Sequence, residues 1–365
     1  MISDYRRREE SITLAPLEQQ VVPAGDGEPQ VELLTVNMGP HHPATHGVLR
    51  LLVTLEGEIV RSCHPIVGYV HTGIEKTAED KSYWKVIPVV ERMDYLAYYF
   101  NAQAFCGAVE ALLDTEVPKR AQYLRVIHLE LNRIMSHLVW LGTSALDLGA
   151  ISLFWYCFRE REKVLDLFEY SSGQRMHTRY IQVGGVFEDV PPGWARKVRE
   201  FCRDMPRRAD QYAAILNGNE IFLRRLRNTG VVDEETLLGL GVTGPLLRAA
   251  GNPWDLRKAA PYSSYEDFDF RIPVGTVGDN YDRYRVRLSE IYESVKIIEQ
   301  AIEGPRGELG CFVRADGSAK PARVHMRDPS FVNLQALPHM VRDGYVADLI
   351  ATLGMLDPIL GGIDR

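Results

Sequence analysis

The feature that most constrains the fold is helical hydrophobic spacing that persists from residue 73 to residue 303. Within it, Leu96, Phe100, Ala104 and Ala108 recur every four residues, which is the spacing of one helix face. The pattern predicts helices over about 96–112, 118–138, 149–170, 192–217 and 280–303. Long helices need one another to bury their apolar faces, so the sequence predicts a mainly α protein of the α+β class.

Short β elements are expected on both sides of this helical run. Segments 31–36, 47–55 and 59–67 are rich in Leu, Val and Ile and indicate a small antiparallel sheet. Segments 309–314 and 323–326 indicate a hairpin, followed by an apolar helix at 345–356. The predicted organisation is a flexible arm (1–30), a β-sheet region (31–72), a helical core (73–303) and a C-terminal α+β segment (304–365).

One stretch, 138–158, is long enough to span a membrane but has a charge, Asp147, at its middle. An aspartate there costs roughly 2.5–3.5 kcal/mol on insertion scales. Gly142, Gly149 and several hydroxyl residues favour two helix ends in the same stretch. The interpretation is buried core, and the carboxylate of Asp147 needs a partner or a proton. The first 30 residues contain no apolar stretch of a secretion signal.

The five cysteines are dispersed, and the chain contains no CxxC pair. That excludes a self-contained zinc ribbon, a ferredoxin-type cluster and a thioredoxin-type redox pair. An odd, scattered set is typical of reduced thiols in the cytosol. The formal net charge of −7 disfavours electrostatic binding of nucleic acid.

Residues 239–244 match the dinucleotide fingerprint G-x-G-x-x-G. The fingerprint requires a preceding strand and a following helix N-terminus. Here the preceding residues have a helical pattern, and Pro245 removes an N–H where a phosphate would bind. The segment is therefore interpreted as a loop between helices.

Three histidines, His41, His42 and His46, lie in the Pro/Gly-rich segment 39–47. Three interpretations remain open on chemistry alone. The imidazoles could bind a metal, although Pro43 opposes helical ligand spacing. One of them could donate a proton or hydrogen bond to a ligand. They could also cap local structure.

Two further groups of polar residues stand out. Residues 91–95 are expected to open a helix, with a charged first turn and Tyr95 as an amphipathic core residue. His128, Glu130, Arg133 and His137 interrupt an otherwise apolar helix and are interpreted as surface residues or interhelical pairs.

Several motifs occur in order along the chain: GPHHPATHGVLRLLVTLEGEIV, GYVHTGIEKT, ERMDYL, LGTSALDLGA, GQRMHTRYIQVGGV, PSFVNLQAL and LDPILGGIDR. Together they closely resemble the 49-kDa subunit (the D-type subunit of bacteria) of proton-pumping NADH:quinone oxidoreductase, respiratory complex I. The resemblance covers about residues 33–365. It implies a peripheral-arm subunit in which quinone is reduced by electrons from a partner's terminal [4Fe–4S] cluster.

That family is similar to the large subunit of nickel–iron hydrogenases, which implies a hydrogenase-like helical core. Hydrogenases bind nickel through two CxxC pairs, and thiolates are required for that site. The corresponding segments, 91–97 and 357–362, contain no cysteine. The resemblance therefore implies no metal site in this chain, and a former metal pocket that is available to quinone and closed by residues 304–365.

By motif position, the resemblance assigns roles to four residues. His46 and Tyr95 match the residues that hydrogen-bond the quinone carbonyl oxygens. Asp147 matches the aspartate that hydrogen-bonds the histidine. His177 matches a histidine near the partner's terminal cluster. Imidazole and phenol are reasonable donors to oxygen that gains negative charge on reduction.

The resemblance also implies the setting. The expected partners are the terminal Fe–S subunit, a 30-kDa-type subunit and a membrane-embedded subunit of the quinone channel. NADH, FMN and the Fe–S clusters would be bound by partners, and none by this chain alone. Membrane contact would be through partners, at the cytoplasmic face of the cell membrane, in an electron-transport translocase.

Two departures from the family pattern keep alternatives open. Between Glu303 and Arg306 the chain has only Gly304 and Pro305, where the family carries a longer segment, and Thr72 replaces an arginine of mitochondrial relatives. The short connection is compatible with an inactive structural or assembly paralogue. A related membrane complex fed by ferredoxin would use the same kind of subunit. A hydrogenase is disfavoured by the missing cysteines.

Overall fold

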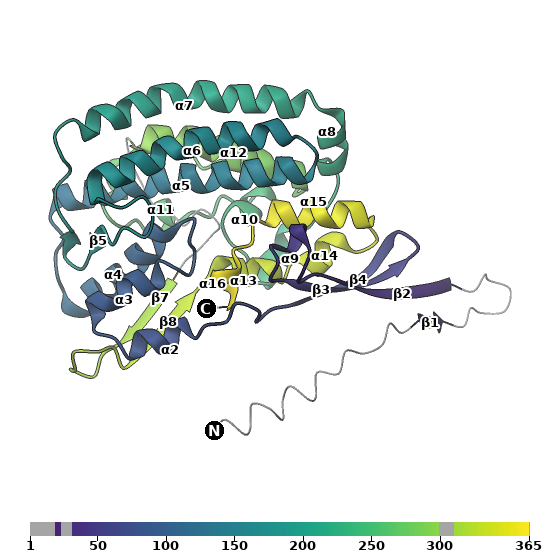
Figure 1. Cartoon of the computed structure of the whole chain (residues 1–365), viewed down its shortest axis with the longest axis horizontal. Helices are drawn as coiled ribbons and strands as arrows, with labels where there is room; N and C mark the ends of the chain where they lie inside the picture. Colours follow the sequence, from purple (N-terminus) through teal and green to yellow (C-terminus); the bar gives the residue numbers. More distant parts are fainter. Residues whose placement is uncertain (1–18, 23–30, 299–309, 365) are drawn as a thin grey trace.

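The computed structural model of the chain describes residues 19–22, 31–298 and 310–364 (Figure 1). The larger helices are α4 (Tyr98–Leu113), α5 (Lys119–Asp147), α6 (Ile151–Ser172), α7 (Trp194–Asn217), α12 (Asn280–Ile298) and α15 (Val346–Leu356). The shorter ones are η1 (Pro43–Thr45), α2 (Ile74–Glu79), α3 (Tyr83–Val90), α8 (Glu220–Leu226), α9 (Glu234–Gly239), α10 (Pro245–Ala249), α11 (Leu256–Ala259), η2 (Tyr265–Asp267), α13 (Pro329–Leu334), α14 (Leu337–Val341) and α16 (Leu360–Asp364).

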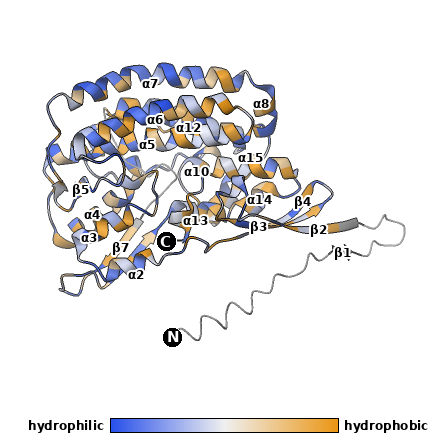
Figure 2. Ribbon diagram, viewed as in Figure 1, coloured by the Kyte–Doolittle hydropathy of each residue, from blue (hydrophilic) through white to orange (hydrophobic). Residues whose placement is uncertain are grey.

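Helix α5 is the centre of the helical core. It packs against α4, α6, α12 and α15, and residues on all its sides are buried. Helix α7 covers α6 and α12 from outside and is largely hydrophilic along its length (Figure 2). Its buried residues recur every three or four positions, as in Val198, Phe201, Cys202 and Met205. A helix that is buried along most of its length and flanked by amphipathic ones is the expected arrangement of such a core.

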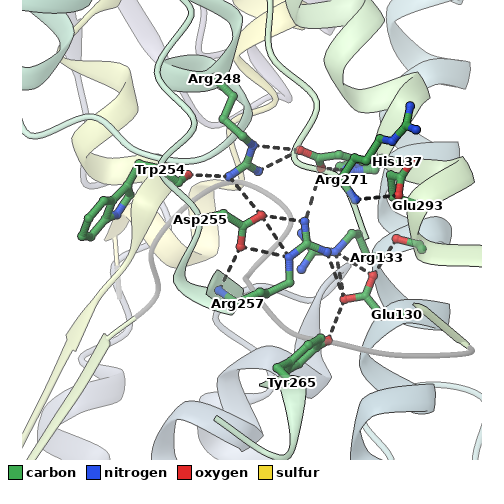
Figure 3. Close-up of polar contacts among 12 residues, drawn as sticks. Glu130, Arg133, His137, Arg248, Trp254, Asp255, Arg257, Tyr265, Arg271 and Glu293 are labelled. Atoms are coloured by element: carbon green, nitrogen blue, oxygen red, sulfur yellow. Dashed lines mark hydrogen bonds and ion pairs between the residues drawn. The ribbon is translucent and has the colours of Figure 1, made fainter. Parts of the chain in front are cut away.

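A network of buried charges crosses the middle of this core (Figure 3). Its ionisable members, all buried, are Glu130, Arg133, His137, Arg248, Asp255, Arg257 and Glu290. Arg248 Nη2 lies 2.7 Å from Glu290 Oε1, and Arg257 Nη2 lies 2.7 Å from Asp255 Oδ2. Arg133 Nε lies 3.1 Å from Glu130 Oε2. The network joins α5, α10, α12 and the start of α11, because buried charges are tolerated only when they are paired.

The N-terminal region is a four-stranded antiparallel sheet in the order β1-β2-β3-β4. Its strands are β1 (Gln19–Val22), β2 (Val31–Met38), β3 (Arg50–Glu56) and β4 (Ile59–Ile66). Alternate residues of β3 are buried, as expected of a sheet with one covered face. Helix α14 packs on β4, and Leu51, Val53 and Val60 share a core with α9, α10 and the C-terminal helices.

Two small hairpins complete the fold: β5 (Ile181–Gln182) with β6 (Gly185–Val186), and β7 (Gly310–Arg314) with β8 (Arg323–Arg327). The β7–β8 hairpin packs against α2 and α4. Helix α16 contacts α13 and ends near the centre of the molecule, between the hairpin and the N-terminal sheet (Figure 1).

The predicted elements are largely confirmed, and the α+β class with them. The helices expected at 118–138 and 149–170 run further, as α5 and α6, and the break between them falls at 148–150. The interpretation of 138–158 as buried core is correct for its first part only. Leu146, Ile151 and Trp155 are exposed, and Asp147 lies at an exposed helix end rather than in the core. No helix in the described part of the chain is long and apolar enough to cross a membrane. The last residues of the helix expected to reach 303 lie outside the described residues, as do the short connection after it and most of the arm.

Three expectations need correction or addition. Residues 91–95 do not open a helix, because α3 ends at Val90 and α4 begins only at Tyr98. His128, Glu130, Arg133 and His137 are not surface residues, since all four are fully buried. The alternative of interhelical pairs is confirmed for His128, which bonds Ser171 of α6, and for His137, which bonds Glu290 of α12. Strand β1, paired with β2, lies within the segment for which a flexible arm was predicted.

Candidate functional site

Two segments that are far apart in the sequence, 91–97 and 357–362, lie against each other in the structure. A Cβ atom added to Gly361 would be only 2.5 Å from the carbonyl oxygen of Met93 and 3.4 Å from that of Arg92. Only glycine permits so close a backbone approach. By the resemblance drawn from the sequence, these segments correspond to those with the nickel-binding cysteines of hydrogenases, and neither contains a cysteine here.

A cavity of about 680 Å³ opens where these segments meet. This is within the range of small-molecule sites. Much of its lining is apolar and includes Val48, Val70, Val89 and Leu360. Tyr95 and Arg92 bring the polar groups of the 91–97 turn into the same wall. The cavity thus combines apolar walls with a phenol and a guanidinium, an arrangement suited to a flat apolar ligand with polar oxygens.

The turn that carries Tyr95 is fixed by Asp94. Its Oδ1 accepts hydrogen bonds from the backbone N–H groups of Leu96, at 3.1 Å, and Ala97, at 2.9 Å. An aspartate that bonds the backbone two and three residues ahead is a stable local alternative to helix. Tyr95 is 39% exposed, so its ring is held at the cavity rather than in the core that the sequence predicted.

The opposite part of the lining is tied to the C-terminal helix. Asp364 of α16 accepts hydrogen bonds from the N–H groups of Gly68, at 2.7 Å, and Val70, at 2.8 Å. His71 also bonds the Asp364 backbone carbonyl. Since Val70 and Leu360 both line the cavity, these bonds join two of its walls.

The histidine-rich loop is a compact turn next to this region. Thr45 Oγ1 donates to the carbonyl oxygens of Pro40, at 3.2 Å, and His42, at 2.9 Å. His42 Nδ1 accepts the N–H of Ala44 at 3.2 Å. The capping interpretation is therefore correct for His42. His46 ends the turn with a left-handed backbone, φ 56°, and is exposed.

Asp147, at the end of α5, lies within electrostatic reach of His46 and His42. Burial raises the pKa of the Asp147 carboxyl, and the two imidazoles oppose that shift. Helix α15 contacts both α5 and η1, so it lies beside this group. The structure thus brings His46 and Asp147 together. His46 is not part of the cavity lining, but Val48, two residues later, is.

His177 lies on the other side of the 91–97 turn, in the segment between α6 and β5. Its ring centroid is 5.2 Å from that of Tyr98, and its Nδ1 is buried without a hydrogen-bond partner among the described residues. Burial lowers the pKa of His177, and the charge of Arg92 lowers it further, while a hydrogen bond to the Glu91 backbone raises it. Arg92 thus lines the cavity and also acts, through its charge, on His177.

The described residues offer no site for a resident metal. Among them, no three His, Cys, Asp or Glu side chains are grouped to hold an ion. Cys63, Cys106 and Cys157 are buried, and burial raises the pKa of the Cys63 thiol to about 12. Buried protonated thiols are poor ligands, so this donor set does not fit an iron–sulfur cluster or nickel.

Comparison with known proteins gives a consistent result. The family described as "Respiratory-chain NADH dehydrogenase, 49 Kd subunit" matches residues 147–303 and 300–365. A D-type subunit of NADH-quinone oxidoreductase from Chloroflexus aurantiacus is 46% identical, with 98% of this chain and 100% of the relative covered. The D-type subunit from a Roseiflexus species is 46% identical over 100% of both chains. That of Bacillus mycoides is 44% identical over 92% of this chain and 99% of the relative.

The chain belongs to the 49-kDa (D-type) subunit family of NADH-quinone oxidoreductase.

This family member is shorter than some of its relatives. The alignments with the Chloroflexus and Roseiflexus proteins extend over 411 and 420 positions, more than the 365 residues of this chain. The two matches to the 49-kDa subunit family meet at residues 300–303. This position is next to the short connection at Gly304 and Pro305, where the family pattern predicts a longer segment. Thr72, the other departure from the family pattern, lines the cavity.

Sequence reasoning missed one residue of this region. Glu91 was interpreted as part of a charged first turn, but its side chain is fully buried. Both of its carboxylate oxygens accept the N–H of Arg179, at 3.0 and 3.3 Å. The available signal was its position directly after the apolar run 86–90, which places residue 91 at the end of a segment expected to be buried.

Proposed function

We propose that this subunit binds a quinone head group in the cavity between the 91–97 turn and the C-terminal segment. Electrons come from the terminal [4Fe–4S] cluster of a partner protein. The observation that carries the proposal is the position of Tyr95, whose ring lines an apolar cavity at the junction of the two cysteine-free segments.

The chemistry assigns a donor role to two side chains. Reduction of a quinone to a quinol takes two electrons and two protons and builds negative charge on both oxygens. Tyr95, which lines the cavity, would donate a hydrogen bond to one oxygen. His46, two residues before the lining residue Val48, would donate to the other oxygen at the edge of the cavity. Both bonds would stabilise the charge and offer a path for protons. Asp147, close to His46, favours the charged form of the imidazole. His177, beside Arg92, would lie on the side of the partner's cluster.

The same proposal includes the setting. The protein would bind the terminal Fe–S subunit, a 30-kDa-type subunit and the membrane subunit of the quinone channel. NADH, FMN and the clusters would remain on partners. The whole assembly would couple quinone reduction to proton translocation at the cytoplasmic face of the cell membrane, and this chain would reach the membrane only through its partners.

The test is quinone reduction by the purified complex with His46→Ala or Tyr95→Phe. We expect each change to lower NADH:quinone activity at least tenfold, because general acid contributions are typically worth more than that. NADH oxidation by an artificial acceptor upstream and the subunit content should be unchanged. Tyr345→Phe, at an exposed tyrosine outside the cavity lining, is the matched control. Full quinone reduction in both site variants would reject the proposal.

The short connection at Gly304 and Pro305 permits one second candidate, a structural or assembly paralogue without turnover. Deletion of the gene separates the two. Loss of quinone-dependent NADH oxidation supports the redox role, and unchanged oxidation supports the paralogue. Ferredoxin-dependent activity in the purified complex would instead identify a different electron donor, since partners and not this chain determine it.

A further inference from the structure

Glu91 holds the backbone of the segment that carries His177. Its side-chain oxygens accept the N–H of Arg179 at 3.0 and 3.3 Å, two residues after His177. The backbone of Glu91 is also close enough to the His177 ring to affect its pKa. Glu91 itself is anchored, since its own N–H donates to the carbonyl of Ile87 at 3.1 Å, at the end of α3.

The segment needs such support because its backbone is unusual. His177 and Arg179 both have left-handed backbones, with φ of 53° and 51°. For a residue other than glycine, this region is sterically unfavourable, and it persists when the surroundings fix the conformation. Thr178 adds a weaker local bond, accepting the N–H of Tyr180 at 3.3 Å.

The consequence of this geometry is the placement of a ring. With residues 177 and 179 fixed, His177 lies against Tyr98 of α4 and within electrostatic reach of Arg92. Arg92 follows Glu91 directly and lines the cavity. One short stretch, 91–95, therefore supplies the cavity with Tyr95 and Arg92 and also anchors the segment of His177.

We propose that Glu91 is a positioning residue, whose carboxyl group holds the backbone at Arg179 and thereby places His177 beside Arg92 and Tyr98. The consequence for turnover rests on the proposed function, whereas the positioning itself does not.

Hydrogen exchange at the Arg179 amide in the intact complex tests the positioning directly. Glu91→Ala removes the acceptor, and we expect exchange at Arg179 to accelerate about tenfold or more. Glu91→Gln keeps an acceptor oxygen and should preserve protection. Glu91→Asp draws the carboxylate back by one methylene and should also lose it, which provides a second test if the alanine variant does not assemble.

Glu75→Ala is the matched control. Glu75 Oε1 accepts the N–H of Met326 at 2.8 Å, so it is another carboxylate that holds the backbone of a distant segment. Its loss should accelerate exchange at Met326 and leave Arg179 unchanged. Unchanged exchange at Arg179 in both Glu91→Ala and Glu91→Asp would overturn the positioning, as would loss of protection in Glu91→Gln.

The pH profile of kcat for quinone reduction provides the functional readout. We expect the profile of Glu91→Ala to shift toward that of His177→Ala, and Glu91→Gln to stay closer to the unmodified enzyme. A purely structural role would lower the amount of complex without changing the profile. If exchange accelerates while the profile is unchanged in both Glu91→Ala and His177→Ala, the positioning stands and the role proposed for His177 fails.

Discussion

Two buried carboxyl groups of this chain, Glu290 in the helical core and Glu91 beside the cavity, have opposite environments. Both side chains are fully buried. Glu290 accepts hydrogen bonds from His137 Nε2 at 2.8 Å and from Arg248 Nη2 at 2.7 Å. Burial alone would raise the pKa of Glu290, but Arg248, His137 and Arg133 hold it well below its usual range. In the core, every charge that the structure describes in this network has a counter-charge.

At Glu91, nearby positive groups offset the effect of burial on the carboxyl less completely. Burial raises the pKa of its carboxyl to about 8, and the Arg179 N–H, Arg92 and the Arg179 side chain offset burial only in part. The carboxyl therefore keeps its proton to a higher pH than an ordinary glutamate. Such shifts are concentrated at functional sites, where charge is not fully neutralised. In the core, the paired charges around Glu290 stabilise the fold. Beside the cavity, Glu91 has no such full pairing and is able to exchange a proton.

The largest effect should come from breaking the core network. Glu290→Ala leaves Arg248 and Arg133 buried without their shared anion, and we expect a loss of about 3–5 kcal/mol in the stability of the chain. Loss of the protein from the purified complex, or a large fall in its inactivation temperature, would measure this.

Lys296→Ala on the same helix is the control, since it removes a pair with Glu293 that is half exposed on the lysine side. Such pairs contribute about 0–1 kcal/mol. Equal effects of the Glu290 and Lys296 changes would contradict the distinction between the core network and ordinary pairs.

A second prediction follows from the sign of the two shifts. A raised pKa at Glu91 means that its contribution to stability is full below the usual carboxyl range and is lost as pH rises from about 4.5 to about 8, by about 1.4 kcal/mol per pH unit at most. The depressed pKa of Glu290 acts the other way, with stability lost as pH falls through the acid range.

Glu91→Gln should therefore flatten the loss of thermal stability between pH 5 and 9. The groups facing Glu91 are Arg92 on its own turn, His177 and Arg179 across from it, and Tyr98, Tyr99 and Cys106 of α4. Neither the tyrosines nor the thiol lose a proton in this window, because burial raises the pKa of all three well above the usual value. A pH profile of the inactivation temperature that is unchanged by Glu91→Gln would contradict the assignment.

Much of the fold could be predicted because its helices follow hydrophobic spacing. Helix α5 begins after Pro118 and ends at Asp147, and each of these boundaries has a local cause in the sequence. The 91–97 turn could not be found this way. Its apolar residues continue the spacing of α4, whereas Asp94 bonds the backbone ahead and stops the helix from starting until Tyr98. Local side-chain bonds of this kind leave no periodic signal.

Some residues of the candidate site could be predicted from the sequence, and others could not. Asp147 was marked by its apolar surroundings, and the structure places it near His46. Tyr95 could be linked to a cavity only by resemblance, because its neighbours in space, Val70 and Leu360, are distant in sequence. Glu91 was missed because its partner, the N–H of Arg179, is a backbone group. A sequence names side chains, but it does not tell which distant backbone groups they reach.

The smallest of the three effects concerns the cavity wall. Gly361→Ala would add a Cβ 2.5 Å from the carbonyl oxygen of Met93, so the C-terminal segment and the 91–97 turn must separate. Such overpacking typically costs about 1–3 kcal/mol, and here it would displace Leu360 and Tyr95, which both line the cavity. We expect KM for quinone to rise about tenfold, with a smaller change in kcat. Gly107→Ala is the control, because its nearest neighbour would be an ordinary 3.6 Å contact with a glutamine side chain. If KM is unchanged in Gly361→Ala while the complex stays intact, quinone binding does not depend on this wall. The cavity beside Glu91 would then not be the quinone site.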